Sequence, residues 1–384
     1  MLADATIDTE IFNTIVREGA AKLPGIVDVT DDPIVSSDVL GSTLSLLFDM
    51  QATEKAGKHI IKALGWYENL GRAVFRILEQ QPGIDITAMH PPVEEMFFRF
   101  TQFKEWDVCE MSFAKSISIM SQPDPWLALI PVFPSRAFRH SSIYVRRDSG
   151  IQSPKDLEGK KVGLPEWAQT AAIYSRGLLA HEYGVDLKKI NWYQAGVNDA
   201  GRKEKVRLQL PAGLSYTPMP HTSLSAMLLS GEVDAVLSAR PPQAFVQHPD
   251  QVQRLIPNYR EVEQAYWKKT GIFPIMHVVA IKRSTYERHP WIAMNLMQGF
   301  EAAKQRSLVR ARDITASSFP LPWVSDYAAA AQDILGSDFW PYGTAANQAT
   351  LDAFCQYAHE QGVTHRLMSA QDIFVPESLQ SVKV

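Results

Sequence analysis

Two arginines and a histidine follow an apolar run in the stretch PVFPSRAFRHSSIYV, at Arg136, Arg139 and His140. Cations beside a buried segment are costly unless an anion meets them. A guanidinium is a planar fork that binds a carboxylate through two hydrogen bonds, and an imidazole exchanges protons near neutral pH. We therefore predict that the arginines bind a small anion and that His140 transfers a proton, with its pKa lowered by the neighbouring cations. A structural ion pair is the alternative for either arginine.

Further polar or aromatic residues lie at the ends of expected strands or in the loops after them. Ligands gather at the carboxyl ends of strands in open α/β sheets, so we expect these side chains to line the same site. Glu110 and His277 are candidates for acid–base catalysis alongside His140, although pairing with an arginine would explain Glu110 equally well. The remaining candidates would bind the substrate, with simple packing as the alternative for the aromatic ones: Tyr67, Ser112, Trp167, Thr170 and Arg240.

Short apolar strands alternate with helical periods from about residue 60 onward. PPVEEMFFRFTQF (residues 91–103) is helical, with prolines at its start, and EWDVCEMSF (residues 105–113) is a buried strand. A later strand is followed by a helix that ends at Gly184, and FPIMHVVAIKR (residues 273–283) is another strand. This alternation predicts α/β layers with largely parallel sheets.

The composition excludes several classes of protein. A formal net charge of -4 over 384 residues, without a long basic run, argues against nucleic acid as a partner. No apolar stretch is long enough to span a membrane, and the first residues lack the cationic and apolar regions of a secretory signal. With only Cys109 and Cys355 present, we expect a cytoplasmic protein without disulfides. The histidines show no HxH or HExxH spacing, so no metal site is expected.

Two segments point to a known family. FPSRAFRHSSIYV (residues 133–145) and PYGTAAN (residues 341–347) resemble sequences of the 4,5-dihydroxyphthalate decarboxylase family, and the resemblance extends over residues 60–384. It implies an α/β, two-lobed fold of the type II periplasmic-binding-protein class with an N-terminal extension. The expected domains are the extension (1–59), lobe 1 (60–150 and 276–384) and lobe 2 (151–275).

The resemblance also implies an activity, the loss of CO2 from 4,5-dihydroxyphthalate or a close ring dicarboxylate to give protocatechuate. Such an enzyme must bind a dianion, remove a catechol proton and protonate the ring carbon that carries the leaving carboxylate. The ring itself stores the charge, so no cofactor is expected. A solute-binding protein for an aromatic carboxylate explains the arginines equally well, but the absence of a secretory signal favours the enzyme. An enzyme resembling thiamine-pyrimidine synthases would need a pyridoxal-binding lysine, or a histidine and cysteine set, that we do not find at matching positions.

The first residues depart from that family. DVTDDPIVSSDVLGSTLSLLFDMQAT (residues 28–53) and GWYENLG (residues 65–71) resemble late segments of glyceraldehyde-phosphate dehydrogenases. The dinucleotide-binding half and the nucleophilic cysteine motif of those enzymes are missing, so no dehydrogenase activity is expected. We predict instead a packing or oligomerisation arm, and hence a homo-oligomer. Chance similarity, or an extension that stays partly disordered, is the alternative.

Overall fold

The computed structural model describes residues 9–24, 27–32, 46–55, 61–66, 91–315, 317 and 319–379. The chain forms two compact units. One unit contains residues 1–88 with residues 302–307, and the other contains residues 89–301 with residues 308–384. All of the candidate site residues except Tyr67 belong to the second unit; Tyr67 lies outside the described residues.

The N-terminal unit contains a helix and a three-stranded sheet: α1 (Thr9–Ala20), β1 (Val27–Thr30), β2 (Leu46–Lys55) and β3 (Ile61–Trp66). β2 is the central strand, and it pairs in parallel with β1 and antiparallel with β3. The ring of Phe12 on α1 lies 6.1 Å from the ring of Phe48 on β2, so the helix packs against the sheet through its apolar side.

The larger sheet of the second unit has six strands in the order β11-β6-β10-β7-β8-β9. Their bounds are β6 (Ile143–Arg146), β7 (Lys161–Leu164), β8 (Asn191–Gly196), β9 (Ser215–Ser223), β10 (Ala235–Leu237) and β11 (Val252–Arg254). β10, β7, β8 and β9 pair in parallel with one another, whereas β6 pairs antiparallel with β10 and β11. β6 joins this sheet although it precedes residue 151, the predicted start of lobe 2. The predicted domain limits themselves stay a prediction.

A smaller sheet has three strands, with β12 (His277–Lys282) between β4 (Val108–Ser112) and β5 (Leu127–Ile130). Both pairings are antiparallel. The expectation of largely parallel sheets is therefore wrong for this sheet. The reason is that the chain returns from the larger sheet in the reverse direction and inserts β12 between two strands that were formed earlier along the chain.

Two segments connect the sheets and lie side by side. The chain passes from β5 to β6 through residues 131–142 and returns to β12 through residues 271–276. Arg136 and Ile275 form an isolated antiparallel bridge, and the amide of Met276 donates to the carbonyl oxygen of Ser135 at 2.8 Å. The expected two-lobed α/β fold class is confirmed by the two sheets and their paired connections.

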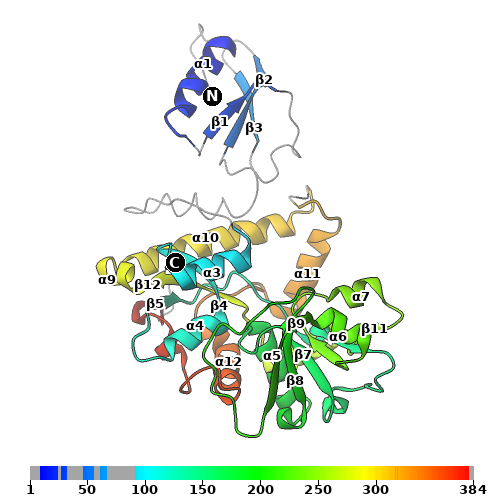
Figure 1. Ribbon diagram of the computed structural model, residues 1–384. Coiled ribbons are helices and arrows are strands. Elements are labelled where there is room, and N and C mark those ends of the chain that lie inside the picture. The colour runs from blue at the N-terminus through cyan, green and yellow to red at the C-terminus, as the bar shows by residue number, and fades with distance from the viewer. Residues whose placement is uncertain are drawn as a thin grey trace. The chain divides into compact units, whose positions relative to one another are not determined.

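Helices pack around both sheets (Figure 1). α6 illustrates how the sequence sets their ends, because the Ser223 hydroxyl accepts from the Ala226 amide at its start and Gly231 adopts a left-handed conformation after its end. Within the described ranges, no helix is long and apolar enough to cross a membrane. The bounds are α3 (Val93–Phe103), α4 (Phe113–Met120), α5 (Thr170–His181), α6 (Leu224–Ser230), α7 (Gln243–Gln247), α8 (Tyr259–Thr270), α9 (Arg283–Arg288), α10 (Ile292–Arg312), α11 (Val324–Leu335), α12 (Gln348–Glu360) and α13 (Ala370–Ile373), with a short 3-10 helix at His140–Ser142.

An aromatic stack at the centre of the core joins three of these helices. The ring of Phe354 on α12 lies 4.7 Å from the ring of Phe113 on α4 and 4.6 Å from that of Tyr174 on α5. All three side chains are buried, and aromatic pairs of this kind stabilise beyond their buried area. The stack holds the first turns of α4 and α5 together, which positions the polar residues that begin both helices.

Candidate functional site

Glu110, Ser112 and His277 come together on one face of the small sheet. Side chains alternate along a strand, so Glu110 and Ser112 leave the same face of β4. The register pairs His277 with Ser112 and Val279 with Glu110, which puts His277 diagonally opposite Glu110. Its Nδ1 lies 2.5 Å from Oε1 of Glu110, and both side chains are half-buried.

This contact determines what the imidazole can do. An Nδ1–H that donates to the Glu110 carboxylate leaves Nε2 as the atom that exchanges a proton with a ligand. The edge of the Phe97 ring packs against the imidazole, with ring centroids 5.0 Å apart. Phe97 and Glu110 together hold the ring in one orientation. Nothing in the sequence pattern indicates the role of Phe97, because it lies on α3, far from His277 along the chain.

Two hydroxyl groups extend the cluster at the start of α4 and α5. The hydroxyl oxygens of Ser112 and Thr170 are 3.0 Å apart, and the amide of Ala114 donates to the Thr170 hydroxyl at 3.0 Å. Ser112 precedes α4 and Thr170 begins α5. The two sheets therefore each contribute a helix start to the same place, as the sequence predicted for these two residues.

Arg139 brings a positive charge to Met276, the chain neighbour of His277. Its guanidinium contacts the sulfur of Met276, the residue before His277, with Nη2 to Sδ at 2.6 Å. The side chain is half-buried, and among the described residues no carboxylate forms an ion pair with it. Burial lowers its pKa to about 10, and Glu263 opposes this effect. A half-buried arginine that contacts a thioether within the described residues is suited to bind an anion.

Lys115 is a second cation that sequence reasoning missed. It lies in the first turn of α4 and is 8% exposed. Burial is the main cause of its lowered pKa, and within the described part of the chain no carboxylate forms an ion pair with it. A signal was present in the sequence, since Lys115 is the one charged residue in the otherwise apolar and small-residue stretch FAKSISIM.

Arg136 has a different environment. Its Nη1 donates to the carbonyl oxygen of Phe273 at 3.0 Å, and its Nη2 donates to the carbonyl oxygen of Pro341 at 2.7 Å and to the side-chain oxygen of Asn347. The guanidinium also lies 5.2 Å from the ring centroids of Phe133 and Phe273. These contacts support a structural role for Arg136. The partners are carbonyl and amide oxygens, and not the carboxylate of the structural ion pair that the sequence analysis named as the alternative to anion binding.

His140 points into the core of the larger lobe. The side chain is 1% exposed, its Nδ1 lies 3.8 Å from Oε1 of Glu263, and its ring packs 5.2 Å from that of Tyr266. Burial lowers the pKa of His140 to about 4, and burial raises the pKa of Glu263 to about 7. The direction for His140 agrees with the prediction, but the predicted cause is wrong because burial and not the neighbouring arginines produces it.

The remaining candidates are not part of the cluster. Trp167 is fully buried, its indole N–H donates to the carbonyl oxygen of Gln361 at 2.7 Å, and the Arg176 guanidinium lies 3.7 Å above the ring. It therefore presents no free face to a ligand. Arg240 is exposed and forms a 3.0 Å ion pair with Glu94 on α3.

Within the described ranges, no three His, Cys, Asp or Glu side chains converge as metal ligands do. Cys109 and Cys355 are buried and free, and burial raises the pKa of each thiol to about 12. Neither thiol is therefore present as the thiolate that nucleophilic chemistry or metal binding requires.

Parts of this chain match two protein families and several known enzymes. Residues 136–205 match the family described as NMT1/THI5 like, and residues 1–69 match the C-terminal domain of glyceraldehyde 3-phosphate dehydrogenase. The chain is 38% identical to 4,5-dihydroxyphthalate decarboxylase of Comamonas testosteroni over 79% of its own length and 93% of that protein. It is 43% identical to the enzyme of the same name from Pseudomonas putida, over 44% of this chain and 67% of that protein.

Other proteins match this chain over a shorter stretch or with lower identity. Glyceraldehyde-3-phosphate dehydrogenase of Thermotoga maritima is 36% identical over 18% of this chain and 21% of that enzyme. Among solved structures, the periplasmic sulfonate-binding protein SsuA from Methylobacillus flagellatus KT is 15% identical with a TM-score of 0.47, covering 85% of this chain and 90% of that chain. The desulfurization enzyme DSZB is 14% identical with a TM-score of 0.40, covering 78% and 88%.

The similarity to these decarboxylases shows the class of this protein: it is an enzyme of the carboxy-lyase class. Its fold contains two α/β lobes. The chain belongs to the 4,5-dihydroxyphthalate decarboxylase family. The resemblance that the sequence motifs indicated is confirmed, both for this family and for the N-terminal segment that is similar to part of glyceraldehyde-phosphate dehydrogenases.

Proposed function

We propose that this protein catalyses the non-oxidative decarboxylation of 4,5-dihydroxyphthalate, or a close ring dicarboxylate, to protocatechuate and CO2. Membership of the family makes this the expected reaction. The observation that carries the proposal within the structure is the 2.5 Å contact between His277 and Glu110, because it orients an imidazole that can exchange a proton beside two hydroxyl groups.

The reaction needs few protein groups. Each carboxylate of the substrate is para to a hydroxyl group, so loss of the phenolic proton pushes electron density onto the ring carbon that bears the carboxylate. That carbon takes up a proton, the bond to the carboxylate breaks, and CO2 leaves as the ring regains aromaticity. The phenolate then recovers its proton, and the net change is the replacement of one carboxylate by one hydrogen. An acid–base group near neutral pH and cations for the carboxylates are sufficient.

We assign the proton transfer to His277, in place of His140, which the sequence analysis favoured. The Nε2 of His277 is the exchanging atom, and Glu110 acts on it as a positioning residue that holds the tautomer and stabilises the imidazolium. His140 lacks these properties because its ring is 1% exposed and both of its nitrogens are without hydrogen bonds among the described residues.

The substrate carboxylates require cations that are not already paired. Within the described residues, no carboxylate forms an ion pair with Arg139 or Lys115. Arg139 contacts Met276, which precedes His277, and Lys115 follows Ser112 by three residues. Ser112 and Thr170 would donate hydrogen bonds to the substrate oxygens. Arg136 and Arg240 are engaged with carbonyl oxygens and with Glu94 respectively, so we assign them no direct contact with the substrate.

The location, the oligomeric state and the domain limits of the protein belong to the same proposal. The free thiols of Cys109 and Cys355 support a cytoplasmic location, where thiols stay reduced. The dehydrogenase-like N-terminal segment supports a homo-oligomer, in which this segment is an assembly arm. The domain limits at residues 59, 150 and 275 complete the proposed organisation, with a small aromatic dicarboxylate as the ligand between the lobes.

Release of CO2 tests the function directly. Purified protein is incubated with 4,5-dihydroxyphthalate, phthalate and other ring acids, with and without a chelator, and CO2 and protocatechuate are measured. We expect both products from the dihydroxylated substrate and none from phthalate, which lacks the para hydroxyl groups. Tight binding of ring acids without release of CO2 would support a solute-binding protein instead.

A further inference from the structure

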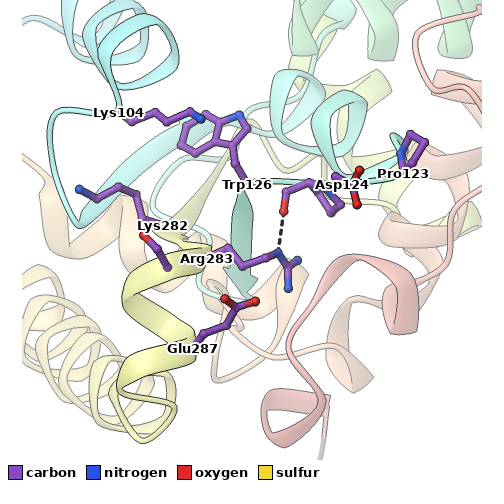
Figure 2. A pocket seen from close by; sticks show the side chains of 9 residues that line it. Lys104, Pro123, Asp124, Trp126, Lys282, Arg283 and Glu287 are labelled. Atoms are coloured by element: carbon purple, nitrogen blue, oxygen red, sulfur yellow. Dashed lines mark hydrogen bonds between the residues drawn. The ribbon is translucent and has the colours of Figure 1, made fainter.

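A pocket lies at the other end of β12 from His277. β12 begins at His277 and ends at Lys282, and the pocket opens beside Lys282 with a volume of about 630 Å³. This volume is within the range of small-molecule sites. The end of α3, the loop before β5 and the start of α9 form its walls (Figure 2). The lining side chains that matter here are Lys104, Asp124, Trp126, Lys282, Arg283 and Glu287.

Two lysines line the pocket, and Figure 2 shows the Lys104 ammonium over the Trp126 ring, whereas the Lys282 side chain extends away from that ring. The Lys104 ammonium lies 5.2 Å from the centroid of the Trp126 ring, and among the described residues no carboxylate forms an ion pair with it. The Lys282 ammonium is 3.4 Å from Oδ1 of Asp107, a long contact that leaves it other hydrogen atoms to donate. The pocket therefore presents one cation, Lys104, beside an indole ring, and Lys282 lies at its edge.

The backbone at Lys104 is held in an unfavourable conformation. Lys104 follows the last turn of α3 with φ 50° and ψ 43°, the left-handed region that lysine rarely adopts. Its amide donates to the carbonyl oxygen of Phe100, so the helix end fixes this geometry. The consequence is that the lysine stem turns back over Trp126 rather than extending into solvent (Figure 2).

Arg283 makes the opposite wall rigid. Its Nε donates to the carbonyl oxygen of Pro125 at 2.6 Å and its Nη2 to that of Leu127 at 2.8 Å, which fixes the loop that carries Trp126. The carboxylates of Asp124 and Glu287 lie away from the Lys104 ammonium in Figure 2. An arrangement of a cation at one side and carboxylates elsewhere fits a ligand that carries a negative group at one end and hydrogen-bond donors at the other.

We propose that this pocket binds a hydroxylated aromatic carboxylate. The carboxylate of the ligand would contact Lys104, its ring would pack against the Trp126 indole, and its hydroxyl groups would donate to Asp124 or Glu287. This site is distinct from the cluster around His277, because the whole length of β12 separates them. The choice of protocatechuate as probe rests on the proposed function, whereas the existence of the site does not.

Calorimetric titration of protocatechuate into the full-length chain tests the site. Besides binding at the proposed active site, we expect a second binding event that Lys104→Gly weakens roughly tenfold or more, the effect of losing one charged hydrogen bond. Glycine suits the left-handed conformation, so this variant keeps the fold. Lys188→Gly is the matched control, because Lys188 is exposed and has no part in the pocket, and it should bind as the unmodified chain does. Benzoate, which lacks hydroxyl groups, and catechol, which lacks the carboxylate, should both bind more weakly.

The outcomes separate this site from the proposed active site. Arg139→Ala should weaken the active-site binding and leave the Lys104-dependent binding in place, and Lys104→Gly should leave the initial rate of CO2 release unchanged. Identical titrations of Lys104→Gly, Lys188→Gly and the unmodified chain would overturn the proposal. A chain that releases no CO2 but loses binding in Lys104→Gly would refute the proposed function and support the pocket.

Discussion

His277 is the residue on which the proposed chemistry depends. Its Nδ1 is held by Glu110, and its Nε2 is the atom available to the substrate. We expect His277→Asn to lower turnover by about 100-fold or more, as removal of a general acid–base group does, with little change in substrate binding. Steady-state rates of CO2 release and calorimetric binding of the substrate provide the measurement.

His140→Asn is the matched control for this substitution. The buried ring of His140 contacts Glu263 and Tyr266 and not the cluster, so its turnover should stay near normal in the folded protein. A large loss of turnover in a folded His140→Asn, with normal rates in His277→Asn, would contradict the assignment and restore the role that the sequence first indicated.

The two neighbouring arginines should respond differently to substitution. Arg139→Ala should weaken binding of the substrate dianion by roughly 2–4 kcal/mol if a carboxylate pairs with it in a desolvated site. Arg139→Lys should restore little of this, because an ammonium lacks the planar fork. Arg136→Ala should instead lower the free energy of unfolding, since it removes the donor to the carbonyl oxygens of Phe273 and Pro341. Normal substrate binding by a folded Arg139→Ala would show that Arg139 does not contact the substrate.

The buried pair of His140 and Glu263 should make the free energy of unfolding depend on pH. In the unmodified protein the two contributions have opposite signs, so the dependence is small. His140 has a pKa of about 4 in the fold, below its usual 6.5, so its contribution to stability is lost as the pH falls through this interval. Glu263 has a pKa of about 7, above its usual 4.5, so its contribution is lost as the pH rises through that interval. Between pH 4.5 and 6.5 the two slopes oppose each other and largely cancel.

Removing one partner should expose the slope of the other. Relative to the unmodified chain, Glu263→Gln should lose about 3 kcal/mol of unfolding free energy as the pH is lowered from 6.5 to 4. His140→Asn should lose a similar amount, about 3 kcal/mol, as the pH is raised from 4.5 to 7. Denaturant unfolding at several pH values measures both slopes. Parallel pH profiles for all three proteins would mean that the pair does not titrate as described.

At the scale of elements, the contact between α5 and α12 leaves no room for another atom. A Cβ at Gly177 of α5 would lie 2.2 Å from a ring carbon of Tyr357 on α12. Gly177→Ala should therefore lower the free energy of unfolding by about 1–3 kcal/mol, although alanine is the better helix former. Gly19→Ala in α1 is the control, because nothing lies within 4 Å of the added carbon there. Thermal unfolding of both variants measures the difference, and equal stabilities would show that α12 can move without cost.

At the scale of the whole molecule, the N-terminal extension is predicted to serve assembly and not chemistry. The catalytic candidates Glu110, His140 and His277 all lie in the second unit. A chain that begins at Ala56 should keep its turnover and show a lower mass in solution by light scattering. Loss of turnover in a folded truncated protein whose mass corresponds to the same oligomer would contradict this division of roles.

The sequence by itself determined the family, the two-lobed class and the local form of many elements. The prolines before Val93, the serine at 223 and the glycine at 231 mark helix ends through preferences that act within a few residues. It also placed Ser112 and Thr170 at a loop or helix start and His277 on a strand, which is where the structure has them, whereas Glu110, expected at a strand end, lies in the middle of β4. Such preferences are local, so they can be recognised without knowing the rest of the fold.

Only the tertiary structure decided which of these side chains meet. Glu110 and His277 are paired because β12 returns antiparallel beside β4, a register that no local pattern encodes. Three basic residues lie within five positions of one segment, yet each has a different environment. Arg136 contacts backbone carbonyl oxygens, Arg139 the sulfur of Met276, and His140 the buried Glu263. The direction and partner of a side chain depend on packing between segments distant along the chain, and for that reason the sequence could propose the site but could not choose between His140 and His277.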